Sequence, residues 1–221
     1  MNVLGIETSS HISSVAAATE QGVFEVEGPS DVRHSVTLMD DCRKAVEQAG
    51  IGIGELDRIA VGLGPGSFTG IRIGCTAAKS LAWTLDIPVG GVSTFQALAS
   101  QTLAGTCIQG RSLYIVADAR RKEFFAGEYC IQDGGAEETF LGVVPVAESK
   151  RFFKPGSAVS GPAAEMLREI CPDMEYVRAD APSASFVASE AVRVSDFRPV
   201  LCADIEPLYL KLSEPERNSA R

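Results

Sequence analysis

The sequence predicts an α/β protein made of two similar lobes, and three observations lead to this expectation. Short apolar runs bounded by turn residues open the chain and are followed by segments with helical periodicity. A second series of strands and helices, in broadly the same order, follows the glycine-bounded linker at 105–110. Of the 221 residues, 45% are hydrophobic, which is enough to fill a sizeable core. We expect one lobe over residues 1–108 and the other over residues 109–221, each a mixed β-sheet with packed helices.

The first lobe is expected to open with an antiparallel meander, because its first three apolar or alternating runs are separated only by turns. In the segment 34–49 the apolar residues recur at helical spacing, and Gly50 follows as a helix stop. The β-rich run at 57–63 leads into a glycine-rich loop before the next helix. The expected elements are strands at 3–6, 14–18, 22–27, 57–63 and 87–89 and helices at 34–49, 70–85 and 94–103.

The second lobe is expected to repeat this order of elements, although no repeat is visible residue by residue. Its expected elements are strands at 113–116, 124–131, 139–146 and 158–160 and helices at 162–170 and 183–193. Two lobes of this kind facing one another form the architecture of the actin, hexokinase and Hsp70 superfamily, the ASKHA fold. In that layout a ligand lies between the lobes, where the strand ends converge.

The charge balance makes a stand-alone nucleic-acid binder an unexpected function. The chain has 20 basic and 29 acidic residues, a net charge of -9 and a pI near 4.8. Such a surface as a whole repels a phosphate backbone. The start of the chain has no basic segment followed by a long apolar one, and no apolar run is of membrane length. We therefore expect a cytoplasmic protein with no membrane association.

The cysteines and histidines predict no metal site. The closest cysteines, Cys107 and Cys130, are 23 residues apart, so zinc-binding spacing is absent and the cysteines are expected to act as small core residues. The two histidines, His11 and His34, are also 23 residues apart, so a helical pair of imidazole ligands is impossible.

The glycine-rich stretch at 64–74 is open to two interpretations. Glycines at a strand-to-helix junction permit a tight turn and a close approach of backbone, and the first amides of a helix also favour anions. The stretch lacks the Lys-Ser/Thr ending of a P-loop and does not have the spacing of a dinucleotide fingerprint. The stretch is therefore interpreted either as a purely structural turn or as a phosphate contact.

Four stretches carry a specific resemblance to a known family. They are Val-Leu-Gly-Ile-Glu-Thr-Ser at 3–9, Arg-His-Ser at 33–35, the glycine stretch at 64–74 and Asp-Ala-Arg at 118–120. On these residues the chain resembles the TsaB (YeaZ) family, strongly over 1–104 and sparsely beyond, where 160–162 and 207–211 are further anchors. The resemblance implies a non-catalytic partner of TsaD, the catalytic subunit that forms threonylcarbamoyladenosine (t6A) in bacterial tRNA.

The departures from the catalytic relative are informative. At the positions of its HxxxH metal pair this chain has Thr94 and Leu98, and neither a single hydroxyl nor an alkyl group replaces imidazole as a ligand for iron or zinc. A glycine pair near adenosine is reduced to Gly161-Pro162, which argues against nucleotide binding of the usual kind. Where the TsaB pattern has a glycine after 118–120, this chain has a cationic turn at 121–123. That turn is either a solvated hairpin end or a contact for a phosphate or an acidic partner.

The resemblance places a vestigial nucleotide cleft at the ends of two equivalent strands. Its expected residues are Glu7, Thr8, Ser9, Gly64, Gly66, Ser67 and Asp118. Glu7 and Asp118 are also candidates to hold a hydrated Mg²⁺ through their carboxylates. We expect no tightly bound cofactor, with ATP and Mg²⁺ binding only weakly or in a complex.

The predicted partner interface uses the two long helices of the first lobe. Its expected residues are Val36, Met39 and Arg43 on the first helix and Ile71, Cys75, Ala78 and Ala82 on the second. Packed against an equivalent pair of helices, these two stripes would form a four-helix interface with an apolar centre. The alternative is that both stripes face the sheet of this protein itself.

The leading functional hypothesis is an accessory subunit that binds and activates a TsaD-like enzyme. The resemblance implies a TsaE-like ATPase as a further partner and contact with tRNA only through the complex. A homodimer in isolation is expected because an exposed apolar stripe tends to pair with another copy. No residue is expected to be catalytic. The alternatives are an autonomous ASKHA kinase or ATPase that uses Asp118, or a glycoprotease-like hydrolase, for which no catalytic arrangement is visible.

Overall fold

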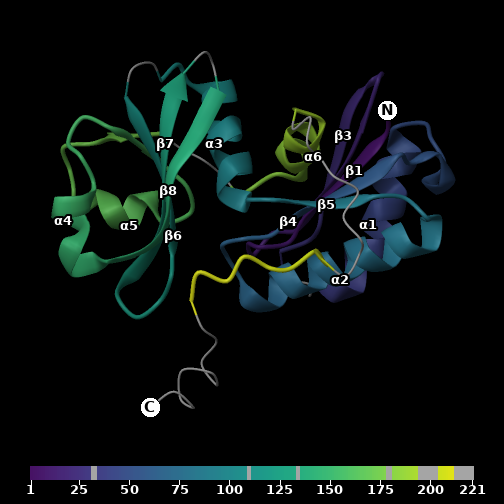
Figure 1. Cartoon of the computed structure of the whole chain (residues 1–221), viewed down its shortest axis with the longest axis horizontal. Helices are drawn as coiled ribbons and strands as arrows, with labels where there is room; N and C mark the ends of the chain where they lie inside the picture. The colour runs from purple at the N-terminus through teal and green to yellow at the C-terminus, as the bar shows by residue number, and fades with distance from the viewer. Residues whose placement is uncertain (31–33, 109–110, 133–134, 178–180, 194–203, 212–221) are drawn as a thin grey trace.

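The protein consists of two lobes that lie side by side, each built on a five-stranded sheet (Figure 1). The structure is a computed structural model, and it describes residues 1–30, 34–108, 111–132, 135–177, 181–193 and 204–211. None of the helices within these ranges is long and apolar enough to cross a membrane.

The first sheet has the strand order β3-β2-β1-β4-β5. Strand β1 pairs antiparallel with β2 and parallel with β4, so the meander expected at the start of the chain is extended by parallel strands. The strands are β1 (Val3–Glu7), β2 (Ser14–Thr19), β3 (Gly22–Glu27), β4 (Arg58–Gly62) and β5 (Val89–Val92).

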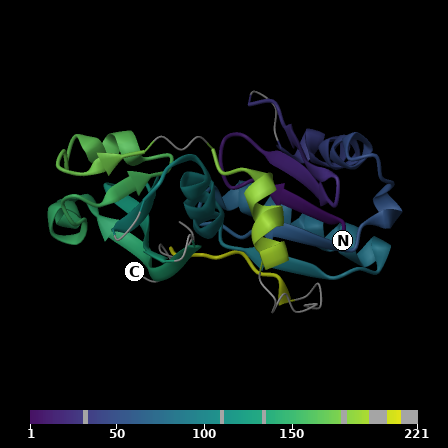
Figure 2. The same cartoon turned by 90° about the horizontal axis from the view of Figure 1, so that it is seen from above.

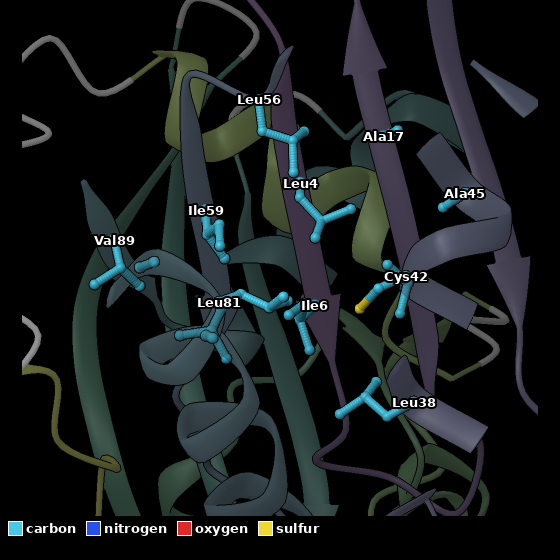
Figure 3. Packing of buried hydrophobic residues seen from close by; sticks show 14 of the residues in the cluster. Leu4, Ile6, Ala17, Leu38, Cys42, Ala45, Leu56, Ile59, Leu81 and Val89 are labelled. Atoms are coloured by element: carbon cyan, nitrogen blue, oxygen red, sulfur yellow. The ribbon is translucent and has the colours of Figure 1, made fainter. Parts of the chain in front are cut away.

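Helices α1 (His34–Gln48) and α2 (Phe68–Leu85) supply the apolar residues that bury one face of this sheet. Leu38 and Cys42 of α1 and Leu81 of α2 belong to the same buried cluster as Leu4 and Ile6 of β1 (Figure 3). The helical spacing in the sequence therefore marks the faces that stabilise the first lobe by apolar burial.

The second sheet repeats the strand order of the first, which confirms the predicted fold class. Its order is β10-β9-β6-β7-β8, so numbering from the first strand of each lobe gives 3-2-1-4-5 in both. Strand β6 pairs antiparallel with β7 and parallel with β9, as β1 does with β2 and β4. The strands are β6 (Ser112–Asp118), β7 (Glu123–Gln132), β8 (Gly135–Pro145), β9 (Ala158–Ser160) and β10 (Glu175–Tyr176).

Short elements that the sequence did not predict complete the molecule. They are the strand β10, the helix α4 (Ser149–Phe152) and the 3₁₀ turns η1 (Ile53–Glu55) and η2 (Val146–Glu148). Helix α5 (Ala164–Arg168) is shorter than its expected range of 162–170. Strand β5 begins at Val89, after the expected start at 87, and β8 begins at Gly135, before the expected start at 139.

Helix α3 (Thr94–Gly105) lies between the lobes. Its Phe95 and Leu98 are buried in a cluster with Leu113 and Ile115 of the second sheet, whereas its Ala97 belongs to a cluster of the first lobe. This helix therefore contributes apolar area to both cores.

Helix α6 (Ala184–Arg193) corrects the expectation that residues 109–221 form one lobe. Its Val187, Ala188 and Ala191 pack with Val3 and Ala60 on the face of the first sheet opposite to α1 and α2 (Figure 2). The chain thus returns to the first lobe after completing the second. The physical reason is that the first sheet has two apolar faces and α1 and α2 cover only one.

The cysteines only partly follow the expectation that they fill the core. Cys42, Cys75 and Cys171 are buried, but Cys107 is exposed and Cys130 is partly exposed. All five are free, and Cys202 lies outside the described residues.

Candidate functional site

A cleft of about 780 Å³ lies between the lobes. The turn after β1, the glycine loop before α2 and the first turns of α3 form one side, and the turn after β6 faces them. Its lining residues are Ser9, Ser10, His11, Pro65, Gly66, Ser67, Phe68, Thr94, Phe95, Leu98, Ala117, Asp118, Ala119, Arg120, Phe125, Pro162, Pro182 and Lys211. Of the predicted cleft residues, the structure brings Ser9, Gly66, Ser67 and Asp118 to this surface.

The glycine loop packs the start of α2 directly onto the end of β1. The Ser67 amide donates to the Ser9 carbonyl over 2.7 Å, and the Ser67 hydroxyl caps α2 by accepting from the Gly70 amide over 3.2 Å. A side chain at Gly66 would place its Cβ 2.5 Å from the Ser9 carbonyl oxygen, and one at Gly70 would collide with the carbonyl of Thr8. Close packing of backbone therefore accounts for these glycines without a ligand.

Glu7 is fully buried and does not line the cleft, which corrects the expectation for this residue. Its Oε1 accepts from the Ser9 amide over 2.6 Å, and its Oε2 accepts from the Thr94 hydroxyl over 2.9 Å. Burial raises the pKa of Glu7 above its ordinary value of 4.5, and the hydrogen bonds from Ser9 and Thr94 oppose this shift.

Thr8 and Gly64 are also structural rather than cleft-lining residues. The buried Thr8 hydroxyl donates to the Gly70 carbonyl over 2.8 Å, and the buried Gly64 amide donates to the Thr94 hydroxyl over 3.1 Å. The carboxylate of Glu7, the hydroxyl of Thr94 and the amide of Gly64 thus tie together β1, the glycine loop and α3. Because Glu7 does not face the cleft, it does not share a Mg²⁺ site with Asp118 there.

Asp118 ends β6 and organises the turn that faces the glycine loop. Its Oδ1 accepts from the Arg120 amide over 2.7 Å, and the Arg120 guanidinium lies 3.6 Å from its Oδ2. Arg120, Arg121 and Lys122 all adopt left-handed backbone conformations, with φ of 62°, 57° and 61°. Successive residues of this kind without glycine are unfavourable, so the surrounding hydrogen bonds must hold the turn.

Thr94 and Leu98, the two positions that the resemblance aligns with a metal pair, lie in the cleft wall. Thr94 is 1% exposed and its hydroxyl is committed to Glu7 and Gly64, while Leu98 offers only an alkyl group. This donor set does not fit a transition metal. Within the described ranges no group of three His, Cys, Asp or Glu side chains is placed to hold a metal ion.

The predicted partner interface divides into exposed and buried residues. On α1, Val36 is 71% exposed and Met39 53% exposed, and the exposed Arg43 pairs with Asp40 and Glu47. The four α2 residues are buried in the first lobe, which corrects the prediction for them: Ile71, Cys75, Ala78 and Ala82. Their stripe faces the protein's own sheet, because the short side chains let α2 lie close to it. The outer side of α2 carries Trp83, which is 81% exposed.

Sequence reasoning missed two features of the cleft. It identified Thr94 only as a lost metal ligand, but Thr94 is the hydrogen-bond partner of Glu7. It identified residues 207–211 only as an anchor of the resemblance, yet Lys211 lines the cleft. No local pattern in the sequence signals either feature, because both depend on contacts between distant segments.

Comparisons with known proteins agree on one family. A family model described as "TsaD: tRNA N6-adenosine threonylcarbamoyltransferase" matches residues 28–193. The chain is 35% identical over 139 residues to the "tRNA threonylcarbamoyladenosine biosynthesis protein TsaB" of Bacillus subtilis, covering 62% of this chain and 59% of the relative. It is 31% identical over 147 residues to the protein of the same description from Escherichia coli, covering 63% of this chain and 61% of the relative. The matched region thus spans about three fifths of each of these relatives.

The similarity to a solved structure extends over almost the whole chain. "YeaZ from Pseudomonas aeruginosa" superposes with a TM-score of 0.79 at 26% identity and covers 95% of this chain and 99% of that one. The superposition therefore includes both lobes and is not confined to the first.

Proposed function

This chain belongs to the TsaD family, on its TsaB (YeaZ) branch, and we propose that it is an accessory subunit that binds and activates a TsaD-like enzyme. The reaction of the complex would be the transfer of a threonylcarbamoyl group to adenosine in tRNA. In this role the chain supplies a binding surface and the partner supplies the catalytic groups.

The observation that carries the proposal is the state of Thr94. It occupies the position of a metal ligand in the catalytic relative, but its hydroxyl donates to Glu7 and accepts from Gly64 inside the protein. This hydroxyl is buried and already makes two hydrogen bonds inside the protein, so it is poorly placed to ligate a metal in the cleft. The nearby Leu98 has no donor atom, so these two positions do not supply the ligands for metal-assisted transfer.

The surface we assign to the partner is the outer side of α1, with Val36, Met39 and Arg43. An exposed valine and methionine beside an arginine match the apolar centre and charged rim of a protein interface. Trp83 of α2 is a further exposed apolar side chain of the same lobe. In isolation the same face would pair with a second copy of this chain.

The remaining partners follow from the same role. A TsaE-like ATPase would join the complex, and tRNA would be contacted through the complex rather than by this acidic chain alone. ATP and Mg²⁺ would bind the isolated chain weakly, because Glu7 is withdrawn from the cleft and only Asp118 remains there. The site of action would be the cytoplasm.

Reconstitution tests the proposal directly. The purified chain, given threonylcarbamoyl-AMP and tRNA, should form no t6A, and a TsaD-like enzyme with a TsaE-like ATPase should form much more t6A when the chain is added. Product formation by the chain alone, or full activity of the partners without it, would reject the accessory role.

One observation favours a second candidate function, an autonomous ASKHA-type kinase or ATPase. Asp118 lines the cleft opposite the glycine loop, where such an enzyme would place a base or a metal anchor. Calorimetry of the isolated chain with MgATP distinguishes the two functions. Tight binding would favour the enzyme, and weak or no binding favours the accessory subunit.

A further inference from the structure

The segment Asp204–Lys211, here called the C-terminal strap, crosses from the first lobe to the second. Figure 1 shows it in yellow, passing from beside α2 toward the second sheet. At its start Ile205 is buried in the core of the first lobe, and at its end Lys211 lines the inter-lobe cleft. The strap therefore has one end fixed in each lobe.

In the first lobe the strap is attached to both sides of the glycine loop. The Leu208 amide donates to the carbonyl of Leu63, just before the loop, over 2.8 Å. The ring of Tyr209 packs against Phe68, just after the loop, with centroids 5.0 Å apart. Arg72 lies 3.8 Å above the Phe68 ring and donates from Nε to the Tyr209 hydroxyl over 2.7 Å.

In the second lobe the strap is attached to the left-handed turn after β6. Lys211 Nζ donates to the Ala119 carbonyl over 2.8 Å and to a carboxylate oxygen of Glu123. The Lys211 side chain is 14% exposed and that of Glu123 is 32% exposed, so this ion pair is partly shielded from solvent. Ala119 and Glu123 flank the three left-handed residues, and they also bond to each other from the Ala119 amide to the Glu123 carbonyl over 3.0 Å.

We propose that the C-terminal strap mechanically couples the start of α2 to the turn after β6 and thereby sets the width of the inter-lobe cleft. The ion pair of Lys211 with Glu123 fixes the turn, and the stack of Tyr209 on Phe68 fixes the helix start. A displacement of one end is transmitted to the other, because only Leu210 separates the two anchor residues. The coupling itself needs no partner. Its use to transmit partner binding to the cleft rests on the function proposed above.

Hydrogen exchange on the isolated chain tests the coupling without any partner. In Lys211→Met, amide exchange should accelerate at least about fivefold in the turn at 118–124 and also across the cleft at 63–72. The matched control Lys150→Met makes the same charge change on the exposed side chain of Lys150 and should alter neither region. Acceleration confined to 118–124, or in neither region, would overturn the proposal.

The reciprocal variant tests the opposite direction. Tyr209→Ala should accelerate exchange at 63–72 and also at 118–124, because coupling between two sites acts equally both ways. Lys211→Arg keeps the charge and a donor, so exchange at 63–72 and at 118–124 should stay as slow as in the wild type. This variant keeps the test valid if Lys211→Met folds poorly. Failure of Lys211→Arg to protect 63–72 would contradict the coupling. None of these exchange measurements involves t6A formation. Their outcome therefore tests the coupling separately from the accessory role.

Discussion

The hydroxyl of Thr94 donates to Glu7 Oε2 over 2.9 Å and so joins two residues 87 positions apart in the sequence. Both groups are buried, and the same hydroxyl accepts from the Gly64 amide. Thr94, which the resemblance aligns with a metal ligand of a TsaD-like enzyme, thus stabilises the junction of β1, the glycine loop and α3 in this protein.

Two substitutions at Thr94 should distinguish the stability that its hydroxyl contributes from the stability that the shape of its side chain contributes. Thr94→Val removes a donor to the buried carboxylate and an acceptor for the Gly64 amide, and should lower the free energy of unfolding by about 1–3 kcal/mol. Thr94→Ser keeps the hydroxyl and should cost clearly less. Urea denaturation at neutral pH measures both values. Equal losses in the two variants would mean that the hydroxyl contributes nothing.

The pH dependence of stability should reveal the buried carboxyl of Glu7. Its pKa in the folded protein is above 4.5, so the folded protein retains this proton when the unfolded chain has released it. Its contribution to stability is complete below pH 4.5 and is lost as the pH rises through the folded pKa. Glu7→Gln has no such loss. As the pH rises from about 4 to about 7, the free energy of unfolding of the wild type should therefore fall relative to that of Glu7→Gln.

Urea titrations of the wild type and Glu7→Gln at several pH values measure this shift. The absolute difference at one pH includes the altered hydrogen bonds to Ser9 and Thr94, so the change with pH is the informative quantity. A difference that is constant across the range would show that the pKa of Glu7 is not raised.

A methyl group in the first turn of α2 should destabilise the first lobe. In Gly70→Ala the added Cβ meets the Thr8 carbonyl, which cannot move without disturbing β1, so we expect a loss of about 2–4 kcal/mol. Gly54→Ala is the control, because nothing lies within 4 Å of an added Cβ there. Its effect should stay within about 1 kcal/mol. Thermal or urea unfolding compares the two, and a tolerated Gly70→Ala would contradict the close packing.

Partner binding should depend on the outer side of α1 and not on the inner side of α2. Met39→Asp changes an exposed side chain and should leave stability within about 0.5 kcal/mol of the wild type while it weakens co-purification with a TsaD-like enzyme. Ala78→Arg forces a charge into the first core and should cost about 3 kcal/mol or more. Unchanged complex formation by a folded Met39→Asp would place the interface elsewhere.

Most secondary structure was predictable because periodicity reports which residues share a face. The pattern from 34 to 49 predicts α1 within one residue of its observed end, and the apolar run at 158–160 coincides with β9. Strand β10 has only two residues, too few for any alternation to be visible. The overall fold followed from the order of elements, which both lobes share.

Periodicity does not say what a face will meet, and this explains the errors at the candidate site. Ile71 and Ala78 do share a face of α2, but that face meets the protein's own sheet. The buried Glu7 accepts a hydrogen bond from Thr94 of a distant segment, and no local pattern links the two residues. The attachment of Lys211 to Glu123 is equally remote in sequence. Contacts of this kind are set by the assembled lobes rather than by neighbouring residues.

The placement of α6 has a consequence for the order in which the molecule forms during translation. Strands β1 and β4 leave the ribosome early, but the helix that covers their second face is made only after the whole second sheet. Until then Val3 and Ala60 lack their final covering, and the nascent first lobe exposes an apolar surface. Premature termination before residue 184 would release a polypeptide with that surface permanently open, a natural target for chaperones and proteases.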